Sequence, residues 1–144
     1  AVYMHPLIDG TARYRYATGN RVGICSPPKP AGFAPVFDAC GVMCLKQAET
    51  ALQQSVLPVI FMDELGVMEA EAERFCLAVC ALFSNPRYYI IGAVKPRRTR
   101  FLPVLEQMPE AAVFHLTLQN RAELYAQLER AQNFAAFLHT VGTK

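Results

Sequence analysis

A run of four apolar residues at 59–62, Val-Ile-Phe-Met, followed at once by two acids, constrains this chain more than any other segment. Four residues are too few for a helix, and the run shows no alternation of apolar and polar side chains. Such runs are typical of strands that are covered on both faces, as in parallel sheets. We therefore expect a buried parallel strand over residues 59–62, followed directly by Asp63 and Glu64.

Helical and strand-like segments alternate along the rest of the chain after residue 36. The expected elements are helices over residues 38–53, 69–84 and 101–108, strands over 59–62, 88–94 and 112–116, and a closing helix that begins at Asn120, with Glu123 completing its capping signal. Alternation with short connections predicts an α/β domain with helices packed on a largely parallel sheet and right-handed crossovers.

The amino-terminal 35 residues have a different pattern, with short extended segments between turn sequences. Strands are expected over residues 2–8, 11–16 and 21–25, because Asp-Gly and Thr-Gly-Asn sequences between them favour hairpin turns. Residues 26–32 contain three prolines and are expected to form a loop that continues neither a strand ladder nor a helix. The prediction is one domain over 1–144, with a β-meander and loop over 1–35 and an α/β core over 36–144.

Composition and charge exclude several classes of protein. The chain has 144 residues, 53% of them hydrophobic, which is enough for a sizeable core and excludes a wholly disordered chain. A formal net charge of +2 is far from the basic excess of a dedicated nucleic-acid binder, so no DNA partner is expected. No apolar run approaches the ~18 residues of a membrane span, and the first ten residues lack an export signal. We therefore expect a cytoplasmic protein without a membrane partner.

Four of the five cysteines form two pairs, each with a spacing of four residues inside a predicted helix: Cys40 with Cys44, and Cys76 with Cys80. Two such pairs could form a four-thiolate zinc site if the helices met, but structural zinc sites usually use tighter Cys-x-x-Cys knuckles on turns. Small buried thiols in a reducing compartment are the favoured interpretation.

The two acids after the apolar run are the best candidates for chemistry. Open α/β sheets bind their ligands at the carboxyl ends of the strands, which is where Asp63 and Glu64 are expected. One interpretation is a Mg²⁺ site in which the first acid holds the ion against phosphates and the second orients a water molecule. The other is that both acids only charge the start of the following helix, which stabilises a helix by about 0.3–1 kcal/mol.

A basic segment, residues 95–100, follows the predicted strand at 88–94 on the same edge of the sheet. Lys95 and Arg98 are candidates for contacts with phosphate. The alternative, which we favour, is a solvated loop whose charges balance acids of the neighbouring helix. His115 is expected to be a hydrogen-bonded core residue of its strand.

Two longer motifs carry a resemblance to a known family. Residues 63–69 read Asp-Glu-Leu-Gly-Val-Met-Glu, and residues 116–124 read Leu-Thr-Leu-Gln-Asn-Arg-Ala-Glu-Leu. The two motifs, with a helix and a strand around 90–92 between them, resemble the small nucleoside-triphosphatase family of P-loop proteins over about residues 37–128. The resemblance implies a three-layer, RecA-like fold with helices on both faces of a mostly parallel sheet.

The resemblance also implies an activity, the Mg²⁺-dependent hydrolysis of nucleoside triphosphates, with broad tolerance of the base. By position, Asp63 matches the magnesium-associated acid and Glu64 the acid that activates water. Glu69 matches a third acid, for which we expect either a structural role or a contact with the residues that bind the metal. Asn120 and Arg121 match the late motif, where a helix cap and an ion pair explain them as well as nucleotide contact does.

The chain departs from the family in one respect, since G-x-x-x-x-G-K-[ST] occurs nowhere in the 144 residues. The family carries this phosphate-binding loop before the region that matches here, so we expect a front end that was removed or was never present. Without the strand that carries the loop, the sheet would have an unpaired edge and an apolar flank, which predicts self-association. The competing function is therefore a non-catalytic interaction module that keeps the fold and the two acids but binds a protein.

Overall fold

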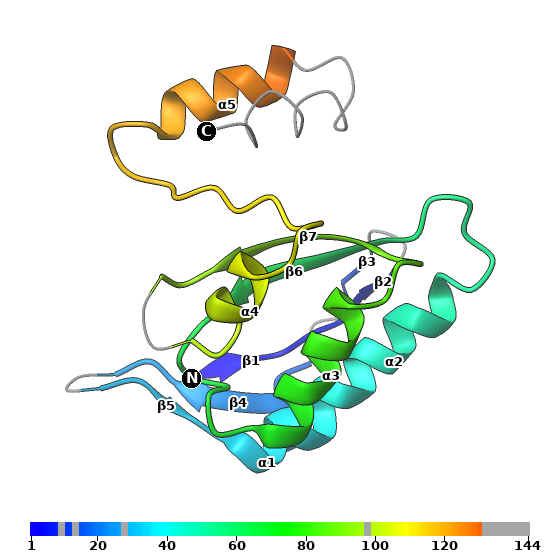
Figure 1. Cartoon of the computed structure of the whole chain (residues 1–144). Coiled ribbons are helices and arrows are strands. Elements are labelled where there is room, and N and C mark those ends of the chain that lie inside the picture. Colours follow the sequence, from blue (N-terminus) through cyan, green and yellow to red (C-terminus); the bar gives the residue numbers. More distant parts are fainter. Residues whose placement is uncertain (9–10, 13–14, 27–28, 97–98, 131–144) are drawn as a thin grey trace. The chain divides into compact units, whose positions relative to one another are not determined.

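The computed structural model describes residues 1–8, 11–12, 15–26, 29–96 and 99–130 (Figure 1). The chain divides into two compact units, Ala1–Val104 and Leu105–Lys144, and each is described by itself.

The centre of the first unit is a parallel pair of strands, β6 (Val59–Leu65) and β7 (Tyr89–Val94). Both strands and their parallel pairing were predicted from the apolar runs, and the structure confirms them. Opposite residues run from Val59 with Tyr89 to Met62 with Gly92. β6 extends three residues beyond the predicted end at 62, so that both acids lie inside the strand.

The two faces of this sheet differ in burial. Ile60 and Met62 are buried, whereas Phe61 and Tyr89 keep 74% and 62% of their surface exposed. Because successive side chains of a strand point to opposite faces, the exposed residues define an open apolar face. Within the described residues of the first unit only one face of the strand pair is covered, and a three-layer arrangement is not confirmed.

One long helical stretch precedes β6, where a helix was predicted over 38–53. It consists of α1 (Ala34–Val36), a π-helical turn η2 (Phe37–Gly41) and α2 (Val42–Ala51). Gly41 allows close packing in this stretch, because a Cβ atom there would lie 2.6 Å from the ring of Phe75. The neighbouring Phe37 ring lies 5.4 Å from that of Phe75, centroid to centroid.

Helix α3 (Glu73–Phe83) lies beside α2 in Figure 1 and begins four residues later than predicted. Residues 69–72 form a turn, in which the Ala72 amide donates to the carbonyl of Glu69. The first turn of α3 is capped from far along the chain, because Oδ1 of Asp38 accepts a 2.9 Å hydrogen bond from the amide of Phe75. A helix start that depends on such a distant acceptor is not visible in local sequence.

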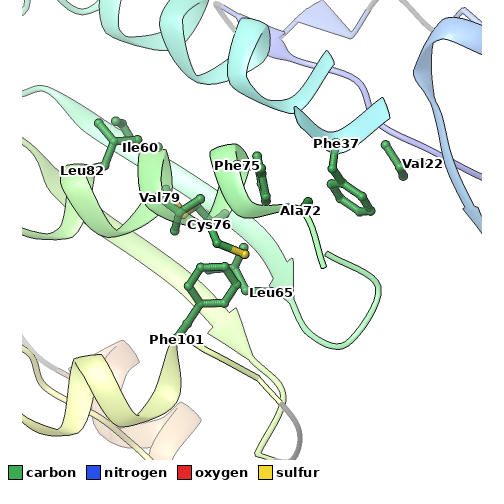
Figure 2. Packing of buried hydrophobic residues seen from close by; sticks show 11 residues of the cluster. Val22, Phe37, Ile60, Leu65, Ala72, Phe75, Cys76, Val79, Leu82 and Phe101 are labelled. Atoms are coloured by element: carbon green, nitrogen blue, oxygen red, sulfur yellow. The ribbon is translucent and has the colours of Figure 1, made fainter. Parts of the chain in front are cut away.

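The apolar side of α3 closes the core (Figure 2). Phe101 and Val79 are fully buried, and Phe101 meets the ring of Phe83 edge to face at 6.2 Å between centroids. The core cluster joins β4, η2, β6, α3 and the segment before α4; its buried members are Val22, Phe37, Ile60, Met62, Leu65, Ala72, Phe75, Cys76, Val79, Leu82 and Phe101.

The amino-terminal segment forms two small antiparallel sheets. The strands are β1 (Val2–Tyr3), β4 (Arg21–Ile24) and β5 (Ala31–Gly32) in one sheet, and β2 (Leu7–Ile8) and β3 (Thr11–Ala12) in the other, with a 3-10 turn η1 (Thr18–Asn20) before β4. The antiparallel character is as predicted, but the strands are shorter.

The expectation that 26–32 continues no ladder is wrong at its end, because Ala31 and Gly32 lie after the last proline and pair with β4.

Helix α4 (Leu102–Glu106) lies within the predicted range of 101–108, and α5 (Arg121–Arg130) starts one residue after the predicted position. The strand expected over 112–116 is not found, since the described residues of the second unit form no strand. His115 is exposed rather than in the core, with Nε2 3.7 Å from the carboxylate of Glu106. Among the described residues, no helix has the length and apolar character that a bilayer span requires.

Candidate active site at the end of β6

The two acids of β6 lie in a β-bulge. Met62 is opposite Gly92 and Leu65 is opposite Val94, so two residues of β6 stand where β7 has one. The extra residue lets Asp63 and Glu64 both be exposed in succession, while Leu65 returns to the core. Bulges of this kind re-aim side chains and occur often beside active sites. The prediction placed both acids beyond the strand and did not foresee the bulge.

Glu64 forms an ion pair with Lys95, the residue that follows β7. The Lys95 Nζ atom lies 2.7 Å from Oε1 of Glu64, and each side chain is about half exposed. This hydrogen bond from Lys95 to Glu64 is the main reason why the pKa of Lys95 is raised above its usual value. The structure therefore brings together two of the predicted site residues, from the ends of adjacent strands.

The Asp63 side chain is exposed and has neither a hydrogen bond nor an ion pair within the described residues. Its two carboxylate oxygens are thus available to a ligand. A carboxylate that only charges a helix start would lie at α3, but α3 begins ten residues later, at Glu73. The interpretation that Asp63 and Glu64 only charge the start of the following helix is therefore wrong for both acids.

The loop after β6 is closed by a buried acid. Glu69 is only 4% exposed, and its carboxylate accepts a hydrogen bond from the amide of Gly66. The Cys76 thiol in turn donates to the carbonyl of Glu69 at 3.3 Å. These contacts hold the loop that directly follows the two acids.

The amino-terminal sheet supports the same loop. Gly32 of β5 lies so close to the backbone of Met68 that no side chain fits between them, and Gly23 of β4 lies against the end of the Met68 side chain. Glycine is required here for close approach of two backbones. The sheet over the first 35 residues thereby fixes the position of the loop, a role that the sequence did not indicate.

The remaining basic residues differ in their placement. Arg100 donates to the carboxylate of Glu73 at 2.9 Å, as expected for a basic loop that balances acids of the neighbouring helix. Arg98 lies outside the described residues.

Asn120 and Arg121 belong to the second unit. There Oδ1 of Asn120 accepts a hydrogen bond from the backbone amide of Thr117, and the backbone amide of Asn120 donates one to the Thr117 hydroxyl. The side-chain amide of Asn120 donates a third hydrogen bond, to the carbonyl of His115. This reciprocal pattern organises the start of α5 from Thr117 rather than from Asn120 with Glu123. Nucleotide contact by Asn120 and Arg121 stays a prediction.

The cysteines of α2 and α3 have the properties of thiols in a core. Burial is the main cause that raises the pKa of Cys44 to about 12 and that of Cys76 to about 11. A zinc site requires thiolates, which these environments disfavour. Nor do the described residues contain a cluster of three or more His, Cys, Asp or Glu side chains placed to hold a metal ion.

Comparison with known proteins gives one match. A family model described as NTPase matches residues 17–128, which include both motifs discussed above. Neither a search of curated proteins nor a search of solved structures gives a match. The matched region exceeds three quarters of the chain and includes the β6 bulge with its two acids. The chain therefore belongs to the NTPase family, the small P-loop nucleoside triphosphatases, with the α/β fold which that membership implies.

Proposed function

We propose that this chain supplies the metal-facing and water-facing acids of a Mg²⁺-dependent nucleoside triphosphatase, which converts a nucleoside triphosphate to the diphosphate and phosphate. The observation that carries the proposal is the β6 bulge, which exposes Asp63 and Glu64 side by side in the matched region. Family membership supports hydrolysis of nucleoside triphosphates in general, and the geometry of the acids supports the finer assignment.

Asp63 is the proposed magnesium ligand. Mg²⁺ is usually bound by one or two protein carboxylates together with water molecules and substrate phosphates. Asp63 fits this requirement because it offers an exposed carboxylate that has no partner within the described residues. The bound ion would neutralise charge on the phosphates.

Glu64 is the proposed acid that orients and activates water. A carboxylate can accept a hydrogen bond from a water molecule and receive its proton during attack on the terminal phosphate. Lys95 and Arg98 are the proposed phosphate contacts, and Asn120 and Arg121 the proposed nucleotide contacts. The phosphate-binding loop is not among these 144 residues, so the reaction requires that loop in addition to them.

Phosphate release tests the proposal. The assay is run with Mg²⁺ and a panel of nucleoside triphosphates, on this chain and on the polypeptide that the whole reading frame encodes. Glu64→Gln and Asp63→Asn should each lower kcat of the active form by roughly 10²–10⁴-fold, because proton transfer and metal positioning are lost. Glu71→Gln is the matched control, since Glu71 is exposed and its side chain forms no hydrogen bond or ion pair with the described residues. A Glu64→Gln variant that keeps its rate within about twofold would refute the assignment of Glu64.

The competing function is a non-catalytic interaction module, which the open apolar face around Phe61 and Tyr89 favours. The two functions are distinguished by nucleotide binding. Absence of both hydrolysis and Mg²⁺-dependent nucleotide binding in the whole polypeptide would support the interaction module and overturn the enzyme.

A further inference from the structure

The ion pair between Glu64 and Lys95 occupies the acid that the proposed function needs free. Oε1 of Glu64 is 2.7 Å from the Lys95 ammonium. While Oε1 contacts the ammonium, that oxygen is not free to accept a hydrogen bond from a water molecule. The arrangement seen in the structure is therefore a resting arrangement with respect to water activation.

Two further contacts hold Lys95 in place for this ion pair. Its backbone amide donates to the carbonyl of Leu65 at 2.8 Å, which fixes the chain beside the end of β6. Its aliphatic stem lies over Gly66, where an added Cβ atom would be 2.9 Å from Cδ and 3.4 Å from Cγ of Lys95. Gly66 is itself held by the buried carboxylate of Glu69. The backbone hydrogen bond and the close packing on Gly66 thus restrict where the Lys95 side chain can lie, which does not happen in an ion pair between two free surface side chains.

We infer that Lys95 is a positioning residue which holds Glu64 in the nucleotide-free protein and exchanges it for a terminal phosphate oxygen when a nucleoside triphosphate binds. This inference rests on the proposed function, because it assigns a state to the acid that activates water. Exchange is favourable because a triphosphate carries more negative charge than one carboxylate, and a lysine ammonium binds phosphate as a compact point charge. After the exchange the Glu64 carboxylate is free to contact water.

The strength of the pair suits such an exchange. Half-exposed ion pairs change an equilibrium constant by only about 1.5- to 5-fold. A ligand that binds Lys95 only slightly more tightly than Glu64 does is therefore enough to release Glu64. A fully buried pair would resist the exchange, since a buried charge without its partner is strongly disfavoured.

Nuclear magnetic resonance of the lysine ammonium group tests the first half of the inference on the polypeptide encoded by the whole reading frame. The Lys95 signal is assigned by its loss in Lys95→Arg. Without nucleotide, Glu64→Gln should shift this signal. Gly66→Ala should shift it in the same direction, because the added methyl group displaces the Lys95 stem while both charges remain. Gly19→Ala is the matched control, since a Cβ atom there meets nothing within 4 Å.

The second half is tested by adding Mg²⁺ and a non-hydrolysable ATP analogue. The Lys95 signal should then move to the same position in the wild type and in Glu64→Gln. In steady-state kinetics, Lys95→Met should raise KM about tenfold or more, and Lys95→Arg should restore most of the loss, which a merely structural role would not produce.

The outcomes separate the inference from the proposed function. Two results would overturn the inference and leave the proposed function standing. One is a Lys95 signal that does not shift in Glu64→Gln, and the other is a Lys95 signal that does not shift at saturating nucleotide in a protein that hydrolyses the nucleotide. A polypeptide that neither binds nor hydrolyses nucleotide overturns both.

Discussion

The remote cap of α3 gives the sharpest test of how this fold is held together. Asp38, in the π-helical turn η2, accepts a hydrogen bond from the amide of Phe75 across 37 positions of sequence. Asp38→Ala removes the acceptor and leaves that amide partly buried without a partner. Loss of a helix cap costs about 0.5–2 kcal/mol, and we expect about 1–2 kcal/mol here because the bond also joins two helical segments.

Thermal unfolding followed by circular dichroism measures the effect. For a chain of this size, 1 kcal/mol corresponds to roughly 3–5 °C in Tm, so Asp38→Ala should lower Tm by about 3–10 °C. Asp38→Asn keeps an acceptor oxygen and loses only the charge near the helix start, which is worth about 0.3–1 kcal/mol. Its Tm should therefore fall between those of the wild type and Asp38→Ala.

Glu71→Ala is the control for charge alone. Glu71 is an exposed acid near the start of α3, and its side chain forms no hydrogen bond with the described residues of that helix. The reasoning is refuted if Asp38→Ala costs no more than Glu71→Ala, or if Asp38→Asn costs as much as Asp38→Ala.

Three further predictions concern the core, the thiols and the open face. Phe101→Ala should lower the free energy of unfolding by about 3–5 kcal/mol in urea titrations, while Leu77→Ala, at a 64% exposed position, should stay within about 0.5 kcal/mol; equal effects would contradict the described core. The raised pKa values of Cys44 and Cys76 favour the protonated thiol in the folded state, so the free energy of unfolding should stay constant below about pH 9 and fall above it. Cys44→Ala should make that fall smaller. The same fall in Cys44→Ala as in the wild type would count against burial of this thiol. Self-association through the sheet should appear in sedimentation equilibrium as a dimer that Phe61→Lys weakens and Leu77→Lys does not; a monomer at high concentration would refute it.

The elements that were predicted correctly are those with strong local patterns. The apolar runs at 59–62 and 88–94 predicted two parallel strands, and helical spacing predicted the stretches that contain α2 and α3. In both cases the periodicity of burial is a property of the segment itself.

The features that were missed depend on a distant partner. The start of α3 depends on Asp38 and on the turn closed by Glu69, neither of which local periodicity describes. The apolar run at 112–116 predicted a strand, but a strand needs a neighbour for its backbone groups, and the described residues of its own unit, 105–130, include no strand. Ala31 and Gly32 form a strand for the opposite reason, because β4 offers them a partner.

At the site, the identity of the two acids was predictable and their presentation was not. Asp63 and Glu64 follow an apolar run in a recognisable motif. The bulge, in contrast, is defined by the pairing of β6 residues with β7 residues, which the sequence of β6 alone does not contain. One signal could have indicated the ion pair. Glu64 and Lys95 stand at the ends of two strands that were expected to be parallel, and the ends of parallel neighbours meet at the same edge of a sheet.

The seven residues of β6 run alongside six of β7, and this mismatch makes the exposure of two successive acids separable from the scaffold. Deleting one residue between Met62 and Leu65 would bring the two strands into step and leave the ladder and the core contacts of both flanking residues intact. The shortened protein would keep its architecture but present a single acid where two now stand. We therefore expect a one-residue deletion at the bulge to remove the pair of acids that the proposed function requires, with little change in the free energy of unfolding.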